Sequence, residues 1–370
     1  MRTKTAPVDK IFLAIVVILS VFGFFVFLSA SLGLLAREGE IFSKVALKQL
    51  FYGLVLGLPA LYIGMRIPYE RWKKIALPFF LFSLLLTALT FIPQIGYARN
   101  GSHRWIALMG FSFQPTELLK VGLVLYLSLW FANVKQRASE LRYGTLPLLF
   151  ILAAPLILLV AQPDNDSALI LAATGSAIFL VAGGRWRDLG ILFLGLLIAL
   201  TIIIVTRPYV RGRISTFLDP SKDPLGTSYQ VRQAIIAVGS GEIVGRGFGQ
   251  SVQKFNYLPE AVSDSIFAVA AEEFGLLGSI VIVLLYTVFA LRGFWLAVRA
   301  PDLFSRYIIT GFVVVIAAQS FMNIGAMLGL IPLSGQPLIF FSQGGTALVF
   351  ALFEVGIILG ISRQRTHEEG

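Results

Sequence analysis

The chain has 370 residues, of which 57% are hydrophobic and only 14% are charged. Its mean hydropathy of +0.83 excludes an ordinary soluble domain, in which about a quarter of the residues are charged. The net charge of +10 does not indicate nucleic-acid binding, because the basic residues lie in short clusters between apolar runs, as topology signals do. Zero cysteines exclude disulfides and thiolate zinc sites, and two histidines leave little for a histidine-based metal site.

About ten apolar runs are long enough to cross a hydrocarbon core about 30 Å thick. They cover residues 11–33, 45–65, 75–93, 117–134, 145–161, 167–183, 188–206, 265–291, 305–330 and 338–362. Ser29-Ala30-Ser31 imitates a signal-peptide cleavage site, but the first run is longer than a signal-peptide core, so we expect a retained first helix. The sequence therefore predicts an all-α, polytopic membrane protein, with residues 1–370 forming a single domain.

Lysine and arginine are concentrated in alternate connections between these runs. The basic set comprises the N-terminus, the connections around residues 66–74, 135–142, 185–187 and 292–306, and the C-terminus. Basic loops stay on the cytoplasmic side, so both termini are predicted to be cytoplasmic. Residues 207–264 form a single long polar loop that falls on the external face, and long loops in compact folds are usually functional.

Charged residues inside membrane spans are costly, and each is a candidate functional residue. Glu117 and Lys120 follow Gln114-Pro115-Thr116 at the external start of the fourth run, and their i, i+3 spacing places them on one helical face. They could serve an active cavity or form a purely structural ion pair. For Glu272, Glu273 and Glu354, a structural role is at least as good an interpretation.

Asp264 lies where the long external loop meets the eighth run, within reach of a substrate at the headgroup level. It could equally be an N-cap, since Asp is favoured there. The five glycines of residues 239–249 would let backbone amides approach an anion, although their spacing fits neither a Walker loop nor a dinucleotide fingerprint. Arg104 and Lys254 are external cations that could meet a pyrophosphate, or could simply face solvent.

Several ordered segments resemble the SEDS family of FtsW, RodA and SpoVE. They are GSHRWIALMGFSFQPTELLK (101–120), QPD (162–164), RISTFLDPSKDPLGTSYQ (213–230), IAVGSGEIVGRGFGQSVQKFNYLPEAVSD (236–264), AEEFG (271–275) and GLIPLSGQPLIFFSQGG (329–345). The resemblance implies a ten-helix peptidoglycan glycosyltransferase that polymerises lipid II outside the cytoplasmic membrane. It implies a class B penicillin-binding protein and other divisome proteins as partners. The SVQK and YLPE segments favour an FtsW-like role in division over a RodA-like role in elongation.

The resemblance also implies roles for individual residues. The family's essential aspartate falls on Asp264, its paired acidic and basic positions fall on Glu117 and Lys120, and the arginine of its RWI segment falls on Arg104. The family usually has His-Thr before the aspartate and Phe after it, whereas this chain has Val262, Ser263 and Ser265. The aspartate is kept, but any help from that histidine is absent.

Glycan polymerisation joins a GlcNAc 4-hydroxyl to a MurNAc anomeric carbon and displaces undecaprenyl pyrophosphate. Asp264 is the predicted general base, with Arg104, Lys120 and Lys254 as cations for the pyrophosphate and Glu117 orienting Lys120. A divalent cation is compatible with this chemistry, yet no ligand cluster in the sequence demands one. There are two competing interpretations. One is a lipid II flippase or transporter, and the other is a scaffold that activates a penicillin-binding protein.

Overall fold

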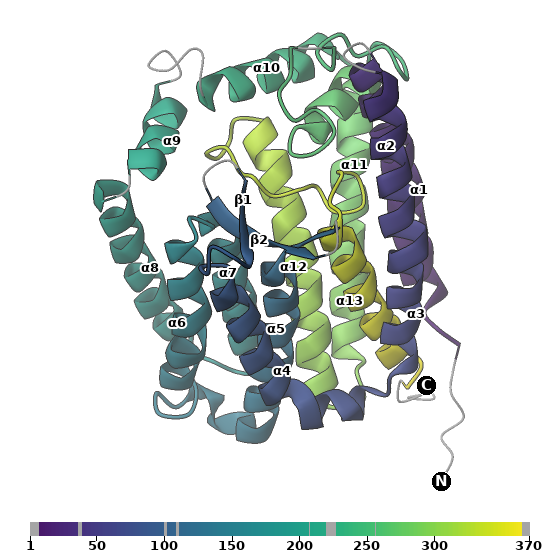
Figure 1. Ribbon diagram of the computed structural model, residues 1–370. Coiled ribbons are helices and arrows are strands. Elements are labelled where there is room, and N and C mark those ends of the chain that lie inside the picture. Colours follow the sequence, from purple (N-terminus) through teal and green to yellow (C-terminus); the bar gives the residue numbers. More distant parts are fainter. Residues whose placement is uncertain are drawn as a thin grey trace.

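The structure is a computed structural model in which residues 7–35, 39–99, 102–108, 111–206, 208–219, 227–255 and 257–364 are described. Its long helices stand side by side as a bundle, with α9 and α10 at one end (Figure 1). The helices that match the predicted runs are α1 (Lys10–Leu35), α2 (Gly39–Leu50), η1 (Phe51–Gly57), α3 (Leu58–Arg66), α4 (Tyr69–Leu89), α5 (Pro115–Val134), α6 (Thr145–Ala161), α7 (Asn165–Val181), α8 (Trp186–Thr206), α11 (Ile266–Val298), α12 (Leu303–Met327) and α13 (Thr346–Ser362).

The apolar character of these helices agrees with a membrane bundle. Within the described residues, six helical segments are long and apolar enough to cross a bilayer, and α6, α7 and α13 are shorter apolar helices. In lipid, a spanning segment must satisfy its backbone hydrogen bonds internally, so apolar runs of this length fold as helices. The predicted all-α, polytopic membrane fold is confirmed.

Three of the predicted runs differ from single continuous α-helices, and the break in α11 is described below. The second run passes from α2 through one π-helical segment, Phe51–Gly57, into α3. The last run is helical only from Thr346, and residues 338–345 form an irregular segment that ends at Gly345, which has a φ of 48°. Glycine adopts this left-handed conformation at little cost, so the chain can turn there into α13.

A small antiparallel sheet of order β1-β2-β3 was not predicted. Its strands are β1 (Gly96–Arg99), β2 (Ser102–Leu108) and β3 (Phe111–Phe113). The sheet lies between α4 and α5 in the chain and carries Arg104 on its central strand. The longest strand, β2, has the sequence SHRWIAL, which does not alternate between apolar and polar side chains, and β1 and β3 are only four and three residues long.

The connections predicted to be cytoplasmic gather at one end of the bundle. The Asp9 amide donates to Ser362 Oγ over 3.1 Å, and Arg292 pairs with the Asp9 carboxylate at 2.6 Å. At the same end of the bundle Lys73 pairs with Asp302 at 2.5 Å. The long loop, with α9 (Pro208–Leu218) and α10 (Thr227–Ser240), lies at the opposite end (Figure 1). This arrangement separates the two sets of loops in the way that the charge pattern predicts.

Helix α11 is interrupted at Gly275, where φ is 65° and ψ is −161°. The glycine-rich segment of residues 239–249 packs against this break. The amides of Leu276 and Leu277 donate to the carbonyls of residues 242 and 243 over 2.9 and 3.1 Å, and the amides of Arg246 and Gly247 donate to the carbonyls of residues 272 and 273 over 3.0 and 2.9 Å. The amides of residues 246 and 247 are therefore bound to carbonyls of α11 and do not face an anion.

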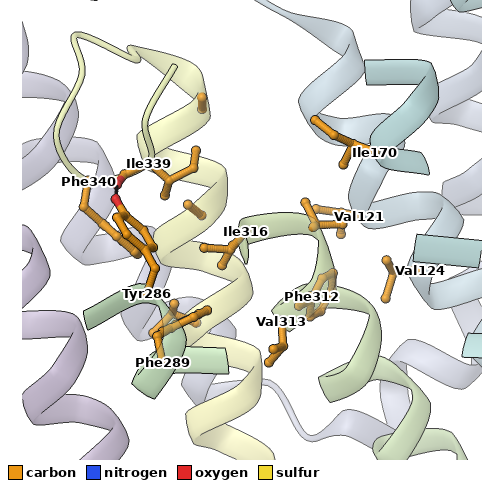
Figure 2. Packing of buried hydrophobic residues seen from close by; sticks show 14 of the residues in the cluster. Val121, Val124, Ile170, Tyr286, Phe289, Phe312, Val313, Ile316, Ile339 and Phe340 are labelled. Carbon is orange, nitrogen blue, oxygen red and sulfur yellow. Dashed lines mark hydrogen bonds between the residues drawn. The ribbon is translucent and has the colours of Figure 1, made fainter. Parts of the chain in front are cut away.

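The bundle core fixes the irregular segment that precedes α13. Figure 2 shows Tyr286 of α11 pointing toward Ile339 and Phe340, and the Tyr286 hydroxyl donates a hydrogen bond to the Ile339 carbonyl. Phe289 and Phe312 pack in the same fully buried cluster. Helices in lipid associate through close packing and buried hydrogen bonds, so these contacts hold a non-helical segment inside the bundle.

Candidate active site

A cavity of about 430 Å³ lies between the sheet, the long loop and the irregular segment before α13. Its walls come from four parts of the chain that are far apart in sequence: α2 with η1, the sheet with the residue that follows it, the long loop, and the residues before α13. The lining residues are Lys48, Gln49, Tyr52, Arg104, Trp105, Ser112, Gln114, Arg213, Gln230, Glu260, Ser263, Asp264, Leu333, Ser334, Gly335, Pro337, Gln343, Gly344 and Gly345. It is the polar hollow at the end of the bundle that carries α9 and α10.

Asp264 lines this cavity and is partly exposed to it. The N-cap of α11 is Ser265, and its side chain makes no capping hydrogen bond. The alternative interpretation of Asp264 as the N-cap therefore does not match the helix boundary. A Cβ atom built on Gly335 would lie 3.8 Å from Asp264 Oδ2 and 4.0 Å from Asp166 Oδ2. The two carboxylates therefore both lie beside Gly335, each within ordinary van der Waals contact of that position.

Two arginines of the cavity wall are held by aspartates that follow α6. Arg104 Nη1 lies 3.6 Å from Asp164 Oδ1, and the Arg104 guanidinium also donates to the Pro163 carbonyl. Arg213 of α9 lies 3.6 Å from Asp166 Oδ2. These pairs fix the two guanidinium groups beside the cavity. Arg213 begins the RISTFLDP segment but was not predicted as a site residue, because nothing in that segment says which carboxylate it will meet.

Glu117 and Lys120 do not line the cavity. They form an ion pair of 2.9 Å on α5, and their side chains are 5% and 0% exposed. Lys120 Nζ also donates to Gln319 Oε1 of α12 over 2.7 Å. The expected shared helical face is confirmed by this contact, but the ammonium is buried among helices and has no direct path to a substrate in the cavity.

Lys254 is likewise buried and lies outside the cavity. Its Nζ is 2.7 Å from Glu273 Oε1, and both side chains are 0% exposed. Ser29 of α1 accepts a hydrogen bond from Lys254 over 3.0 Å and donates to Glu273 over 2.6 Å. This placement contradicts the expectation of an external cation ready for a pyrophosphate, because the ammonium is already neutralised by a buried carboxylate.

The cavity therefore has a defined set of charged groups. Lys48, Arg104 and Arg213 supply positive charge, and Glu260 and Asp264 supply carboxylates. Ser263 donates a hydrogen bond of 2.6 Å to Glu260 Oε2, which orients that carboxylate. Within the described ranges, no group of three or more His, Cys, Asp or Glu residues could hold a metal ion. A carboxylate beside fixed guanidinium groups can accept a proton and stabilise an anionic leaving group at one site.

The family model described as "Cell cycle protein", FTSW_RODA_SPOVE, matches residues 9–367. The chain belongs to this family. A relative in Geobacter metallireducens, named "Probable peptidoglycan glycosyltransferase FtsW", is 37% identical over 96% of this chain and 94% of its own. The stage V sporulation protein E of Bacillus subtilis is 34% identical over 98% of this chain and 99% of its own.

A solved structure of the FtsW/RodA/SpoVE fold also matches this one. A chain from the work described as "Structural coordination of polymerization and crosslinking by a peptidoglycan synthase complex" has a TM-score of 0.80 and 28% identity, and the match covers 98% of this chain and 99% of that chain. The similarity extends over the whole bundle, so the cavity and the long loop lie within the matched region. The predicted family and the multi-pass membrane class are confirmed.

Proposed function

We propose that this protein is a peptidoglycan glycosyltransferase that polymerises lipid II into glycan strands, with its cavity on the outer face of the cytoplasmic membrane and both termini in the cytoplasm. The chain aligns over 96% of its length with a relative named as such an enzyme. The observation that carries the proposal is that Asp264, Arg104 and Arg213 meet at one cavity. This cavity lies at the end of the bundle that the charge pattern assigns to the external side.

The proposed reaction is a displacement in one step. Asp264 acts as the general base and takes the proton of the acceptor hydroxyl as the oxygen attacks the anomeric carbon of the donor. Arg104 and Arg213 stabilise the negative charge that develops on the departing pyrophosphate. A single displacement inverts the anomeric centre, as expected when no second carboxylate serves as a nucleophile. Lys48 adds positive charge at the cavity wall.

Glu117 and Lys120 stabilise the packing of α5 against α12 beside this site and do not bind the anion. Their ion pair is buried and reaches α12 through Gln319. Lys254 and Glu273 play a similar structural part between the long loop, α1 and α11. The cations that meet the pyrophosphate are thus the two arginines.

The partner of this enzyme is a class B penicillin-binding protein that cross-links the nascent strands, and its setting is the divisome. The structural match to a chain of a peptidoglycan synthase complex that coordinates polymerization and crosslinking supports such a partner. The FtsW-named relatives, at up to 38% identity, support a septal role over a RodA-like role in elongation.

The decisive experiment is lipid II polymerisation by the purified protein with and without its transpeptidase partner, comparing Asp264→Asn with Glu260→Gln. Both variants remove a carboxylate from the cavity wall and keep its size. Loss of a general base typically costs about 10² to 10⁴-fold in rate, so the Asp264 variant should make almost no glycan while the Glu260 variant stays active. An Asp264→Asn protein that polymerises at the wild-type rate would refute the mechanism. A wild-type protein that makes no glycan but moves labelled lipid II across vesicles would establish a flippase instead.

A further inference from the structure

The proposed base lies on irregular backbone, and this raises the question of what holds it in place. Asp264 precedes α11 and lies near the end of a run of turns from residue 257 to residue 265. A general base must stay within hydrogen-bond reach of the proton it takes, and small displacements cost much of the rate. If the proposed function holds, the neighbours that fix the Asp264 backbone therefore contribute to catalysis by positioning the base.

Asn323 of α12 contacts this backbone directly. It is fully buried, and its Nδ2 donates to the Asp264 carbonyl over 2.7 Å and to the Gln336 carbonyl over 2.8 Å. An amide nitrogen carries two hydrogens, so one side chain satisfies both carbonyls. Asn323 thereby ties the segment that carries Asp264 to the residues directly before the irregular segment, on the other wall of the cavity.

Ser342 makes a second connection between the same two segments. Its hydroxyl donates to the Ser263 carbonyl over 2.6 Å and accepts from the Leu338 amide over 2.9 Å. The Gln343 amide donates to the Val262 carbonyl over 2.8 Å. Three consecutive carbonyls, those of residues 262 to 264, are therefore held by groups outside their own segment.

The buried ion pair of α5 continues this network. Gln319 lies one helical turn before Asn323, so the two amides project from the same face of α12. Gln319 Nε2 donates to the Pro337 carbonyl over 3.4 Å, while its Oε1 accepts from Lys120 over 2.7 Å. Adjacent carbonyls, those of residues 336 and 337, are thus bound by adjacent amides of α12. Lys120 fixes the orientation of one of these amides.

We propose that Asn323 and Ser342 are positioning residues, which set the place of the Asp264 carboxylate by binding the backbone on which it stands. They touch no substrate, since neither lines the cavity. Hydrogen bonds in a low-dielectric interior are strong, and an unpaired carbonyl there is costly, so the backbone has one favoured arrangement. The irregular segment before α13 and the start of α11 consequently form one rigid unit around the base.

The test compares Asn323→Leu and Ser342→Ala with Asp264→Asn in steady-state lipid II polymerisation. Each of the first two should lower kcat about 10- to 100-fold and leave KM for lipid II unchanged, because the base is misplaced while the arginines stay in position. Ser342→Thr keeps the hydroxyl and should retain most of the activity. Thr310→Val is the matched control, since Thr310 is buried on α12 and its hydroxyl donates to the Arg306 carbonyl within its own helix.

Thermal unfolding of each purified variant separates positioning from folding. A Ser342→Ala protein that unfolds like the wild type yet shows the kcat loss supports the proposal, even if Asn323→Leu fails to fold. Folded Ser342→Ala and Asn323→Leu proteins with wild-type kcat, beside an inactive Asp264→Asn protein, would overturn the positioning role and leave the proposed function standing. A wild-type protein without polymerase activity would overturn both.

Discussion

Lys254 offers the sharpest test of whether a charged residue near the site is structural or functional. Its ammonium and the Glu273 carboxylate are 2.7 Å apart and fully buried, and Ser29 bonds to both. Replacing Lys254 by methionine leaves a buried carboxylate without its cation, a change that typically costs about 3 to 5 kcal/mol. We expect Lys254→Met to lower the free energy of unfolding by this amount.

The double variant Lys254→Met, Glu273→Gln should recover most of that loss. Glutamine keeps hydrogen-bonding groups for Ser29, and replacing a whole buried pair is often close to neutral. Unfolding by SDS in mixed micelles, followed by tryptophan fluorescence, measures the free energy, and lipid II polymerisation is measured on the same samples. If the single variant were as stable as the wild type but inactive, and the double variant stayed inactive, Lys254 would bind substrate and the structural interpretation would be refuted.

Three further predictions follow from the charges. Replacing Glu117 and Lys120 by alanine, singly and together, should impair polymerisation non-additively, because the two form one buried pair; fully additive losses would show that they act separately. Burial alone would raise the pKa of Asp302, but hydrogen bonds from Lys73 and Ser305 outweigh it and hold this pKa below its ordinary value. The carboxylate therefore stabilises the fold above the ordinary pKa of aspartate and loses this effect as pH falls through the lower folded-state pKa. The difference in thermal midpoint between wild type and Asp302→Asn, which keeps a capping side chain, should shrink below about pH 4; a difference constant with pH would contradict this. Reporter fusions should score external after residues 40, 105 and 235 and cytoplasmic after residues 70, 140 and 300, and a cytoplasmic score at residue 235 would overturn the proposed orientation.

The helices could be predicted from the sequence because lipid leaves few alternatives. An apolar run of sufficient length must pair its backbone N–H and C=O groups within itself in a bilayer, so each run predicts a helix. The same rule fails for the tenth run, where residues 338–345 are apolar enough to join it but are irregular. Their backbone groups are bound by other parts of the bundle, as in the hydrogen bond from Tyr286 to the Ile339 carbonyl.

The site was predictable only in part. Asp264 and Arg104 were found from motifs, and the structure brings both to one cavity. Arg213 was not predicted as a site residue, and Lys254 was predicted to face the outside but is buried. Both errors have one cause: the side chains of the long loop find their partners only in the tertiary fold. Arg213 pairs with Asp166, and Lys254 turns inward to Glu273. Both cations look alike in the sequence, but one faces the cavity and the other is buried.

The buried ion pairs also bear on how this chain enters the bilayer during synthesis. Glu117 and Lys120 are three residues apart on one helix, so α5 can leave the translocon already neutralised. Lys254 precedes Glu273 by 19 residues, and the cation therefore emerges from the ribosome before the carboxylate that it must neutralise. An unpaired charge within a spanning helix is costly to insert into the bilayer. Because Glu117 and Lys120 are close in sequence, they can pair as soon as their own helix forms. Their pairing does not depend on helices that are translated later.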